Sequence, residues 1–387
     1  MSRRGGPGAA LLVLALALAA CTGTSSPQAP RLLVVTHEGA SGDAVSLIAD
    51  HGPGESQRLE YLEGTAIELN GEAIALDVLD RAGERDGVAI LVERASGDYA
   101  AVMLATAGID AQAPSAFRIT DEFDLTTLLA EGGHDVSELC LRGIQVSREG
   151  DRLALLDVPE ACPAATQAPE LFVIDVNTSV TTEFAGSENL LPTSPWLDQG
   201  LFGSSETLHY VVGVPGGAGV SWIDMEDLSE PDGPPRTLPG LGNAVPLDLG
   251  PVAGSLAAIT ADRLSHVPLA SDAAAAGSFA LSNAVRLVED PYGNDLASVQ
   301  VIEGSSLAVY PGLGGTGKET VSLGAGITDV VIDGDRLWLY ALRTGGITIV
   351  DMLDAGSPAA RRENVPELAS PGLITWVPGV LPPPDPR

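Results

Sequence analysis

The 387-residue sequence has few of the residue types on which enzymes most often depend. It contains five histidines, three cysteines and a single lysine, Lys318. Acidic residues outnumber basic ones by 52 to 20, which gives a net charge of −32 and a surface that repels nucleic acid. Because Gly315 stands three residues before Lys318, a Ser-x-x-Lys nucleophile is excluded, and no Gly-x-Ser-x-Gly motif occurs either.

Long hydrophobic runs are also scarce, and the clearest one lies at residues 9–20. It is too short for a bilayer core that needs about 20 residues. It follows Arg3 and Arg4 and ends in the small residues before Cys21, a pattern typical of an export signal. The string Leu18-Ala19-Ala20-Cys21 resembles the lipobox of bacterial lipoproteins. The resemblance implies that residues 1–20 are a signal peptide and that Cys21 carries lipid.

The same resemblance implies an extracytoplasmic protein that is bound to a membrane through its lipid. Residues 21–30 then form a flexible tether. Thr22 rather than Asp follows the cysteine, which favours the outer membrane or the cell surface. In such an oxidising compartment, the remaining even pair, Cys140 and Cys162, predicts a disulfide. The two cysteines flank a hairpin whose turn we expect near Gly150.

Helical periodicity is almost absent after residue 30, where short apolar runs alternate with turn residues, as in an all-β protein. Residues 150–155 recur at 334–339, and residues 171–176 recur at 347–352. Both offsets are close to four units of about 45 residues, the length of a four-stranded propeller blade. Third-strand copies are centred on Ile48, Met103, Ile174, Ile223, His266, Val309 and Val350. An insertion at 108–134 contains a short predicted helix at 124–130.

These repeats predict a seven-bladed β-propeller of four-stranded blades at residues 31–378, followed by a Pro-rich tail at 379–387. The first blade is predicted to begin with its second strand at 31–35, and an orphan strand at 373–377 can supply the missing one. Such closure removes exposed strand edges. Tandem β-sandwiches are the alternative fold. The pattern resembles bacterial propellers with WD-repeat-like or surface-layer-type repeats, although Ile174-Asp175 and Val350-Asp351 stand where that family has Trp-Asp.

A glycine-rich string at 312–318 imitates a phosphate-binding loop. Glu319 stands where that motif needs Ser or Thr, and a strand rather than a helix is expected to follow, so the string predicts an ordinary turn. We therefore expect no nucleotide cofactor.

Two acidic segments are candidates for metal binding. Asp290, Asn294 and Asp295 surround a glycine turn, and their oxygen ligands suit calcium. A second cluster consists of Asp77, Asp80, Glu84 and Asp86. Neither has the spacing of an EF-hand, and turn-forming chemistry explains the same residues.

The histidines form no close metal-ligating pair in sequence. His209 and His266 lie in apolar strands and are expected in the core or at its rim. His37 and His51 flank the first predicted hairpin, where a site is conceivable, and His134 follows the predicted helix.

No catalytic residue and no cofactor-binding residue is assigned from the sequence, and calcium is the one cofactor considered. The main hypothesis is a non-enzymatic binding or scaffold module of the cell envelope, with an envelope protein or polysaccharide as partner. The alternative is a propeller hydrolase or lyase, calcium-dependent in one version, with its site at the central channel. Carboxylates or histidines converging at one mouth of the channel would favour the enzyme.

Overall fold

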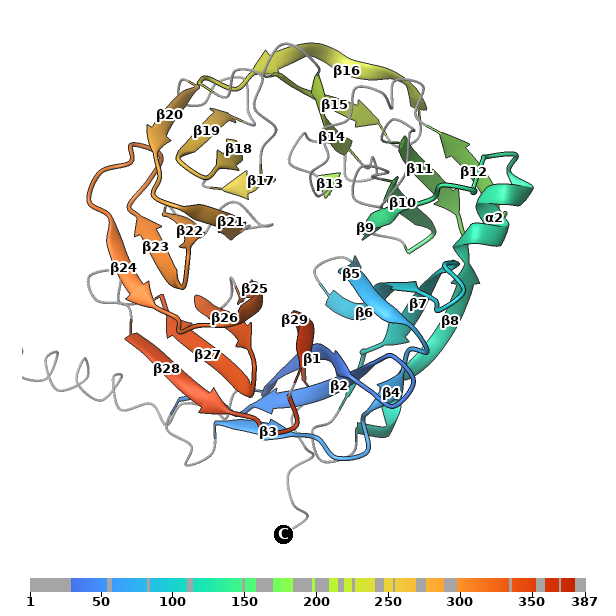
Figure 1. Cartoon of the computed structure of the whole chain (residues 1–387), viewed down its shortest axis with the longest axis horizontal. Coiled ribbons are helices and arrows are strands. Elements are labelled where there is room, and N and C mark those ends of the chain that lie inside the picture. The colour runs from blue at the N-terminus through green and yellow to red at the C-terminus, as the bar shows by residue number, and fades with distance from the viewer. Residues whose placement is uncertain are drawn as a thin grey trace, which may run out of the picture.

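The computed structural model places most of the chain in a single ring of β-sheets (Figure 1). It describes residues 29–53, 58–81, 84–109, 114–147, 150–157, 170–183, 197–198, 209–214, 219–224, 227–240, 247–252, 255–268, 276–288, 298–333, 336–352, 359–368 and 370–379. Within these ranges, no helix is long and apolar enough to cross a membrane.

Six sheets each consist of four strands that follow one another along the chain, with antiparallel pairing throughout. The first three are β5–β8 (Glu72–Arg81, Glu84–Glu93, Tyr99–Ala105, Arg118–Asp124), β9–β12 (Leu141–Val146, Arg152–Asp157, Glu170–Asp175, Val180–Glu183) and β13–β16 (Leu197–Asp198, His209–Val214, Gly219–Asp224, Asp227–Thr237). The other three are β17–β20 (Asp248–Val252, Ser255–Thr260, Arg263–Pro268, Gly277–Ala280), β21–β24 (Ala284–Val288, Val299–Glu303, Ser306–Tyr310, Glu319–Ser322) and β25–β28 (Ile327–Asp333, Trp338–Arg343, Gly346–Asp351, Ala359–Asn364).

The remaining sheet is built from both ends of the chain and closes the ring. Its strands are β29 (Pro371–Pro378), β1 (Arg31–Glu38), β2 (Asp43–Asp50), β3 (Leu59–Tyr61) and β4 (Ile67–Glu68). β29 pairs with β1 as the innermost strand, which is the place expected for the orphan strand. β3 and β4 both pair with β2 and together form one interrupted outer edge.

The predicted all-β propeller is therefore confirmed, and the tandem-sandwich alternative is wrong because the sheets succeed one another around a ring. The prediction of seven four-stranded blades needs correction. Six sheets are blades of four consecutive strands, whereas the closing sheet is a composite of five strands. Its outer edge is broken because the turn at 62–66 separates β3 from β4.

The short predicted helix is also present, as α2 (Leu125–Glu131), and a 3-10 turn, η1 (Pro114–Ala116), precedes β8. Asp124 caps the helix by accepting a hydrogen bond from the Thr127 N–H at 2.9 Å. Leu125 and Leu129 are fully buried and join the core that lies between two neighbouring sheets.

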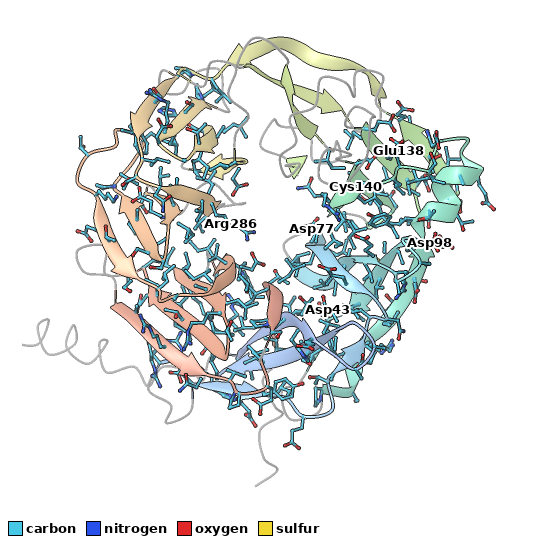
Figure 2. The ribbon with its side chains drawn as sticks, viewed as in Figure 1. Asp43, Asp77, Asp98, Glu138, Cys140 and Arg286 are labelled. Carbon is cyan, nitrogen blue, oxygen red and sulfur yellow. The ribbon has the colours of Figure 1, made fainter. Side chains whose placement is uncertain are left out.

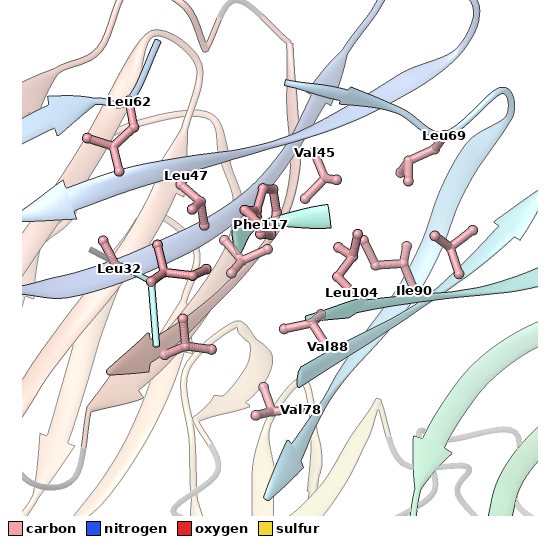
Figure 3. Packing of buried hydrophobic residues seen from close by; sticks show 14 of the residues in the cluster. Leu32, Val45, Leu47, Leu62, Leu69, Val78, Val88, Ile90, Leu104 and Phe117 are labelled. Atoms are coloured by element: carbon pink, nitrogen blue, oxygen red, sulfur yellow. The ribbon is translucent and has the colours of Figure 1, made fainter. Parts of the chain in front are cut away.

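The core lies between successive sheets, so middle strands such as β1 and β7 are buried on both faces. Leu32 and Val34 of β1 pack toward the β5–β8 sheet, in the cluster that Figure 3 shows with Leu47 and Ile90. Leu33 and Val35 pack in the opposite direction, toward β25–β28. Burial on both faces explains why these strands read as continuous apolar runs rather than alternating ones.

Two ion pairs lie in the seam between the closing sheet and β25–β28. Arg31 donates to both carboxylate oxygens of Asp333 at 2.6 and 3.2 Å and lies over the Trp376 ring. Arg58 donates to both oxygens of Asp50 at 2.9 and 3.1 Å. Both carboxylates are fully buried, so the seam is tied by paired charges as well as by apolar contact.

Candidate functional site

The innermost strand of each sheet faces the centre of the ring: β29, β5, β9, β13, β17, β21 and β25 (Figure 1). Figure 2 places Arg286 of β21 and Asp77 of β5 on opposite sides of this centre. The Arg286 side chain is 45% exposed, so a cationic group is accessible in a strongly acidic chain. This residue is the strongest candidate for contact with a ligand at the centre of the ring.

Arg286 is held by a buried carboxylate on the next sheet. Its Nη1 forms an ion pair with Oδ1 of Asp329, whose side chain is only 5% exposed. The other oxygen, Oδ2, accepts the Ile374 N–H of β29 at 2.8 Å, and Oδ1 also accepts the Val330 N–H at 2.8 Å. Burial raises the pKa of Asp329, while the Arg286 guanidinium and the two N–H groups oppose that rise. One carboxylate thus links β21, β25 and the closing strand.

The same kind of link recurs at two other inner strands. Asp77 of β5 accepts the Val146 N–H of β9 through Oδ2 at 2.8 Å. Asp248 of β17 accepts the Leu287 N–H of β21 at 2.9 Å. Each aspartate therefore connects its inner strand to that of the following sheet. Asp77, which belongs to the second acidic cluster considered for metal binding, thus has a structural role.

Two exposed apolar side chains belong to the same part of the ring as Arg286. One is its neighbour in sequence, and the other lies in the adjoining sheet. Val285 of β21 is 50% exposed, and Leu247, directly before β17, is 54% exposed. Of the four exposed large apolar side chains among the described residues, these two lie on or next to inner strands, whereas Ile119 and Val180 lie on outer strands.

The structure describes only some of the metal candidates from the sequence. Asp290, Asn294 and Asp295 lie outside the described residues, as do the side chains of Asp80 and Glu84. Among the residues that the structure does describe, no group of three or more His, Cys, Asp or Glu side chains could hold a metal ion. Calcium therefore stays a prediction for the 290–295 segment.

The four histidines whose side chains the structure describes do not form one cluster. His37 contacts Ser46 at 2.8 Å and His51 contacts Glu60 at 2.8 Å, both within the closing sheet. His134 lies beside α2 and contacts Thr181 at 3.2 Å. His266 is buried in β19, as the sequence predicted, and burial lowers its pKa. The side chain of His209 lies outside the described residues.

The phosphate-loop lookalike is the connection between β23 and β24. Lys318 forms an ion pair with Glu303 and lies 5.8 Å from the centre of the Tyr310 ring. A strand rather than a helix follows the turn, as the sequence predicted.

The cysteines are described only in part. Cys140 is fully buried, and its N–H donates to Asp157 Oδ1 at 2.6 Å. Cys162 lies outside the described residues, so its pairing with Cys140 stays a prediction. Cys21 lies outside them too, and so does the rest of the 1–28 segment.

No family model matches the sequence, and no curated protein matches it. Solved structures match it in fold. The periplasmic gluconolactonase of Pseudomonas aeruginosa is 13% identical, with a TM-score of 0.60, over 90% of this chain and 99% of that one. A candidate 6-phosphogluconolactonase of Bacteroides uniformis is 11% identical, with a TM-score of 0.58, over 90% and 100% of the two chains.

A protein of unknown function from Desulfotomaculum acetoxidans is similar to the same extent: it is 9% identical, with a TM-score of 0.57, over 90% of this chain and 99% of that one. At such identities the likeness shows the fold alone. The chain is a β-propeller in structural class.

Proposed function

We propose that the protein is a propeller hydrolase that opens a small, oxygen-rich cyclic ester, such as a sugar lactone, at the centre of the ring. The observation that carries the proposal is Arg286, a half-exposed guanidinium fixed by a buried carboxylate on an inner strand. Two of the structures with the same fold over 90% of this chain bear lactonase names. This hydrolase reading was the alternative from the sequence, and it now has more support than the scaffold reading.

The role proposed for Arg286 follows from the chemistry of ester hydrolysis. The oxygen of water bonds to the carbonyl carbon, the ring C–O bond breaks, and the alcohol oxygen takes a proton. The product acid releases a proton at neutral pH. Negative charge develops on the carbonyl oxygen along the way, and a preorganised guanidinium stabilises it. Because Asp329 holds the guanidinium, little reorganisation is needed when that charge forms.

Proton release gives a direct assay. Purified protein in a pH-stat is expected to hydrolyse at least one member of a panel of sugar lactones. Arg286→Ala is expected to lower kcat/KM about 100-fold, the usual effect of removing a group that stabilises an oxyanion. Arg362→Ala is the matched control, because Arg362 lies on the outer strand β28 and donates to Ser322. Equal activity of the two variants would remove Arg286 from the mechanism.

A second proposal keeps the non-enzymatic reading, in which the ring binds an envelope protein or polysaccharide. The exposed apolar side chains of Leu247 and Val285 favour it. Proximity labelling in intact cells, with parent protein and a Leu247→Ser, Val285→Ser variant, distinguishes the two proposals. If no lactone is hydrolysed but a labelled partner is lost in the variant, the binding reading is the correct one.

We also propose that Cys21 is lipidated and that it anchors the protein outside the cytoplasm. The support is the lipobox-like string at 18–21. Metabolic labelling with a palmitate analogue is expected to mark the parent protein but not Cys21→Ala. Labelled Cys21→Ala protein in the membrane fraction would contradict the anchor.

A further inference from the structure

Four neighbouring inner strands, β17, β21, β25 and β29, form one arc of the ring's centre (Figure 1). They run in the same direction, because each four-stranded antiparallel sheet returns the chain to the face where that sheet began. Asp248 of β17 accepts the Leu287 N–H of β21, which places these two residues at the same height. Leu247 and Arg286 directly precede them and are therefore level with each other. Leu247 continues the pairing of β17, because its N–H donates to Ile259 O at 2.7 Å.

A β-bulge exposes Val285 beside Arg286. The pairing of β21 with β22 shifts between Ala284 and Arg286, so Val285 is an extra residue in the strand. Such bulges redirect side chains. Val285 is 50% exposed and the Arg286 side chain 45%, whereas Leu287 and Val288 beyond them are buried. The bulge thus presents an aliphatic group and a guanidinium next to each other.

The arc continues on the other side of Arg286, across β25 and β29. Asp329 pairs with Arg286 and accepts the Ile374 N–H, and the residues directly before this link are Thr328 and Leu373. Thr328 is exposed and Leu373 partly exposed, whereas Asp248 and Asp329 are buried. Neighbouring sheets cover both faces of an inner strand, so these exposed side chains border the centre. They comprise one cation, one hydroxyl and three aliphatic groups: Arg286, Thr328, Leu247, Val285 and Leu373.

We propose that the lactone hydrolysed at Arg286 carries an apolar substituent, in addition to its oxygen-rich ring, and that Leu247 and Val285 bind this substituent. The two aliphatic side chains are about half exposed, and covering them with a hydrocarbon chain removes apolar surface from water. A lactone that bears only hydroxyl groups would instead place polar groups against them, which costs free energy. The inference rests on the proposed hydrolase function and narrows its substrate class.

Binding of product-like carboxylates tests the apolar contact without catalysis. Butanoate and octanoate share the carboxylate that an opened lactone bears, and they differ by four methylenes. In calorimetric titration of the whole protein, octanoate is expected to bind at least about tenfold more tightly. Full burial of a methylene strengthens binding about fourfold, and one apolar wall covers about half of it, which leaves about twofold for each methylene. Equal affinities, or no saturable binding of octanoate, would overturn the inference.

Variants test the location through the ratio of the two affinities, which cancels any general loss of binding. Leu247→Ser with Val285→Ser should lower the ratio below about threefold, because the apolar wall is lost. The matched control is Ile119→Ser with Val180→Ser, which removes the exposed aliphatic groups of β8 and β12 and should keep the ratio of the parent. Arg286→Gln should weaken both carboxylates by a similar factor. Equal ratios in the two double variants would overturn the site.

Hydrolysis separates this inference from the hydrolase proposal. γ-Octalactone, which bears a butyl chain, is expected to exceed γ-butyrolactone at least about tenfold in kcat/KM, from the same four methylenes. If sugar lactones are hydrolysed and γ-octalactone has no such advantage, the hydrolase proposal stands and the apolar substituent is wrong. If no lactone is hydrolysed but octanoate binds as described, the hydrolase proposal and its substrate are wrong, and the apolar contact beside Arg286 is retained.

Discussion

The Asp50 side chain accepts hydrogen bonds from three residues in the seam between the closing sheet and β25–β28. Its two oxygens accept from Arg58, from the Gly52 N–H at 2.9 Å and from the Tyr340 hydroxyl at 2.8 Å. Burial raises the pKa of Tyr340 far above its usual range, and the nearby Asp50 carboxylate adds to the rise, so the phenol stays a donor. Asp50 therefore joins the end of β2 to the adjacent sheet through Tyr340 of β26.

Asp50→Asn is expected to lower the free energy of unfolding by about 3–5 kcal/mol. It leaves the Arg58 guanidinium buried without its charge partner, which costs more than the pair itself contributes. Urea denaturation of parent and variant measures the change. Asp121→Asn on the exposed strand β8 is the control and should shift stability by less than about 0.5 kcal/mol. A small effect at Asp50 would mean that water reaches Arg58.

Glu170 gives the protein a pH dependence of stability with a definite sign. Burial raises its pKa from 4.5 to about 7, with repulsion from Glu183 and Asp157 adding to the rise. Between these two pKa values the folded chain binds the proton and the unfolded chain does not. Stability is then present below about 4.5 and is lost as the pH rises through about 7.

Glu170→Gln should remove this component. The melting temperature of the parent is expected to fall more between pH 5 and pH 8 than that of the variant, and the variant should be the more stable at pH 8. Glu131→Gln, at an exposed position on α2, serves as control and should follow the parent. Parallel pH profiles for Glu170→Gln and the parent would show that the Glu170 carboxylate is solvated.

At the scale of elements, the glycine-rich turn between β23 and β24 shows what backbone conformation requires. Gly315 has a φ of +65°, and a Cβ there would lie 2.4 Å from Cβ of Phe279. Gly314, directly before it, has no atom within 4 Å of such a Cβ. Of two adjacent glycines in one turn, Gly315 thus has no room for a side chain, whereas Gly314 has room for one.

Gly315→Ala is expected to lower the free energy of unfolding by about 1–3 kcal/mol, from the left-handed conformation and the contact with Phe279. Gly314→Ala in the same turn is the matched control and should be near neutral, within about 0.5 kcal/mol. The midpoints of urea denaturation measure the stability of both variants, provided that the dependence of the unfolding free energy on urea is unchanged. Equal effects would show that the turn rearranges to accommodate a side chain.

The strands were predictable from the sequence because they are buried on both faces. Continuous apolar runs such as those around Val34 and Ile349 mark the middle strands, and their spacing revealed the repeat. Outer strands such as β12 and β24 were less visible, since they are short and polar. The break between β3 and β4 could not be predicted, because it depends on Thr65 bonding to residues of β2 and its own turn.

The candidate site was not predictable in the same way. Arg286 and Asp329 are 43 residues apart and meet only because consecutive inner strands adjoin at the centre of the ring. The one available signal was an aspartate within an apolar strand, as at Asp248 and Asp329. The sequence does not reveal the role of such an aspartate, because the N–H group from which it accepts a hydrogen bond belongs to the next sheet.

For the molecule as a whole, closure of the ring depends on the two ends of the described chain. β29 pairs with β1 over most of its length, and the Gly379 N–H donates to Pro30 O at 3.0 Å beyond it. Trp376 donates to Ile332 O at 2.8 Å and lies in the core against β25–β28. β29 therefore covers the inner edge of β1, contributes Trp376 to the core and provides the Ile374 N–H that binds Asp329.

A chain that ends at residue 370 is expected to lose cooperative folding, whereas one that ends at 379 should behave as the parent does. Without β29 the inner edge of β1 is unpaired and prone to associate with other chains. Size-exclusion chromatography and circular-dichroism melting distinguish the outcomes.

Adding residues 371–379 to the shorter chain as a separate peptide should restore the monomer and its melting transition, because pairing with β1 needs no covalent link. If the shorter chain is a stable monomer by itself, the ring closes without β29. In that case Asp329 must find another donor, and the orientation of Arg286 would have to come from β21 and β25 alone.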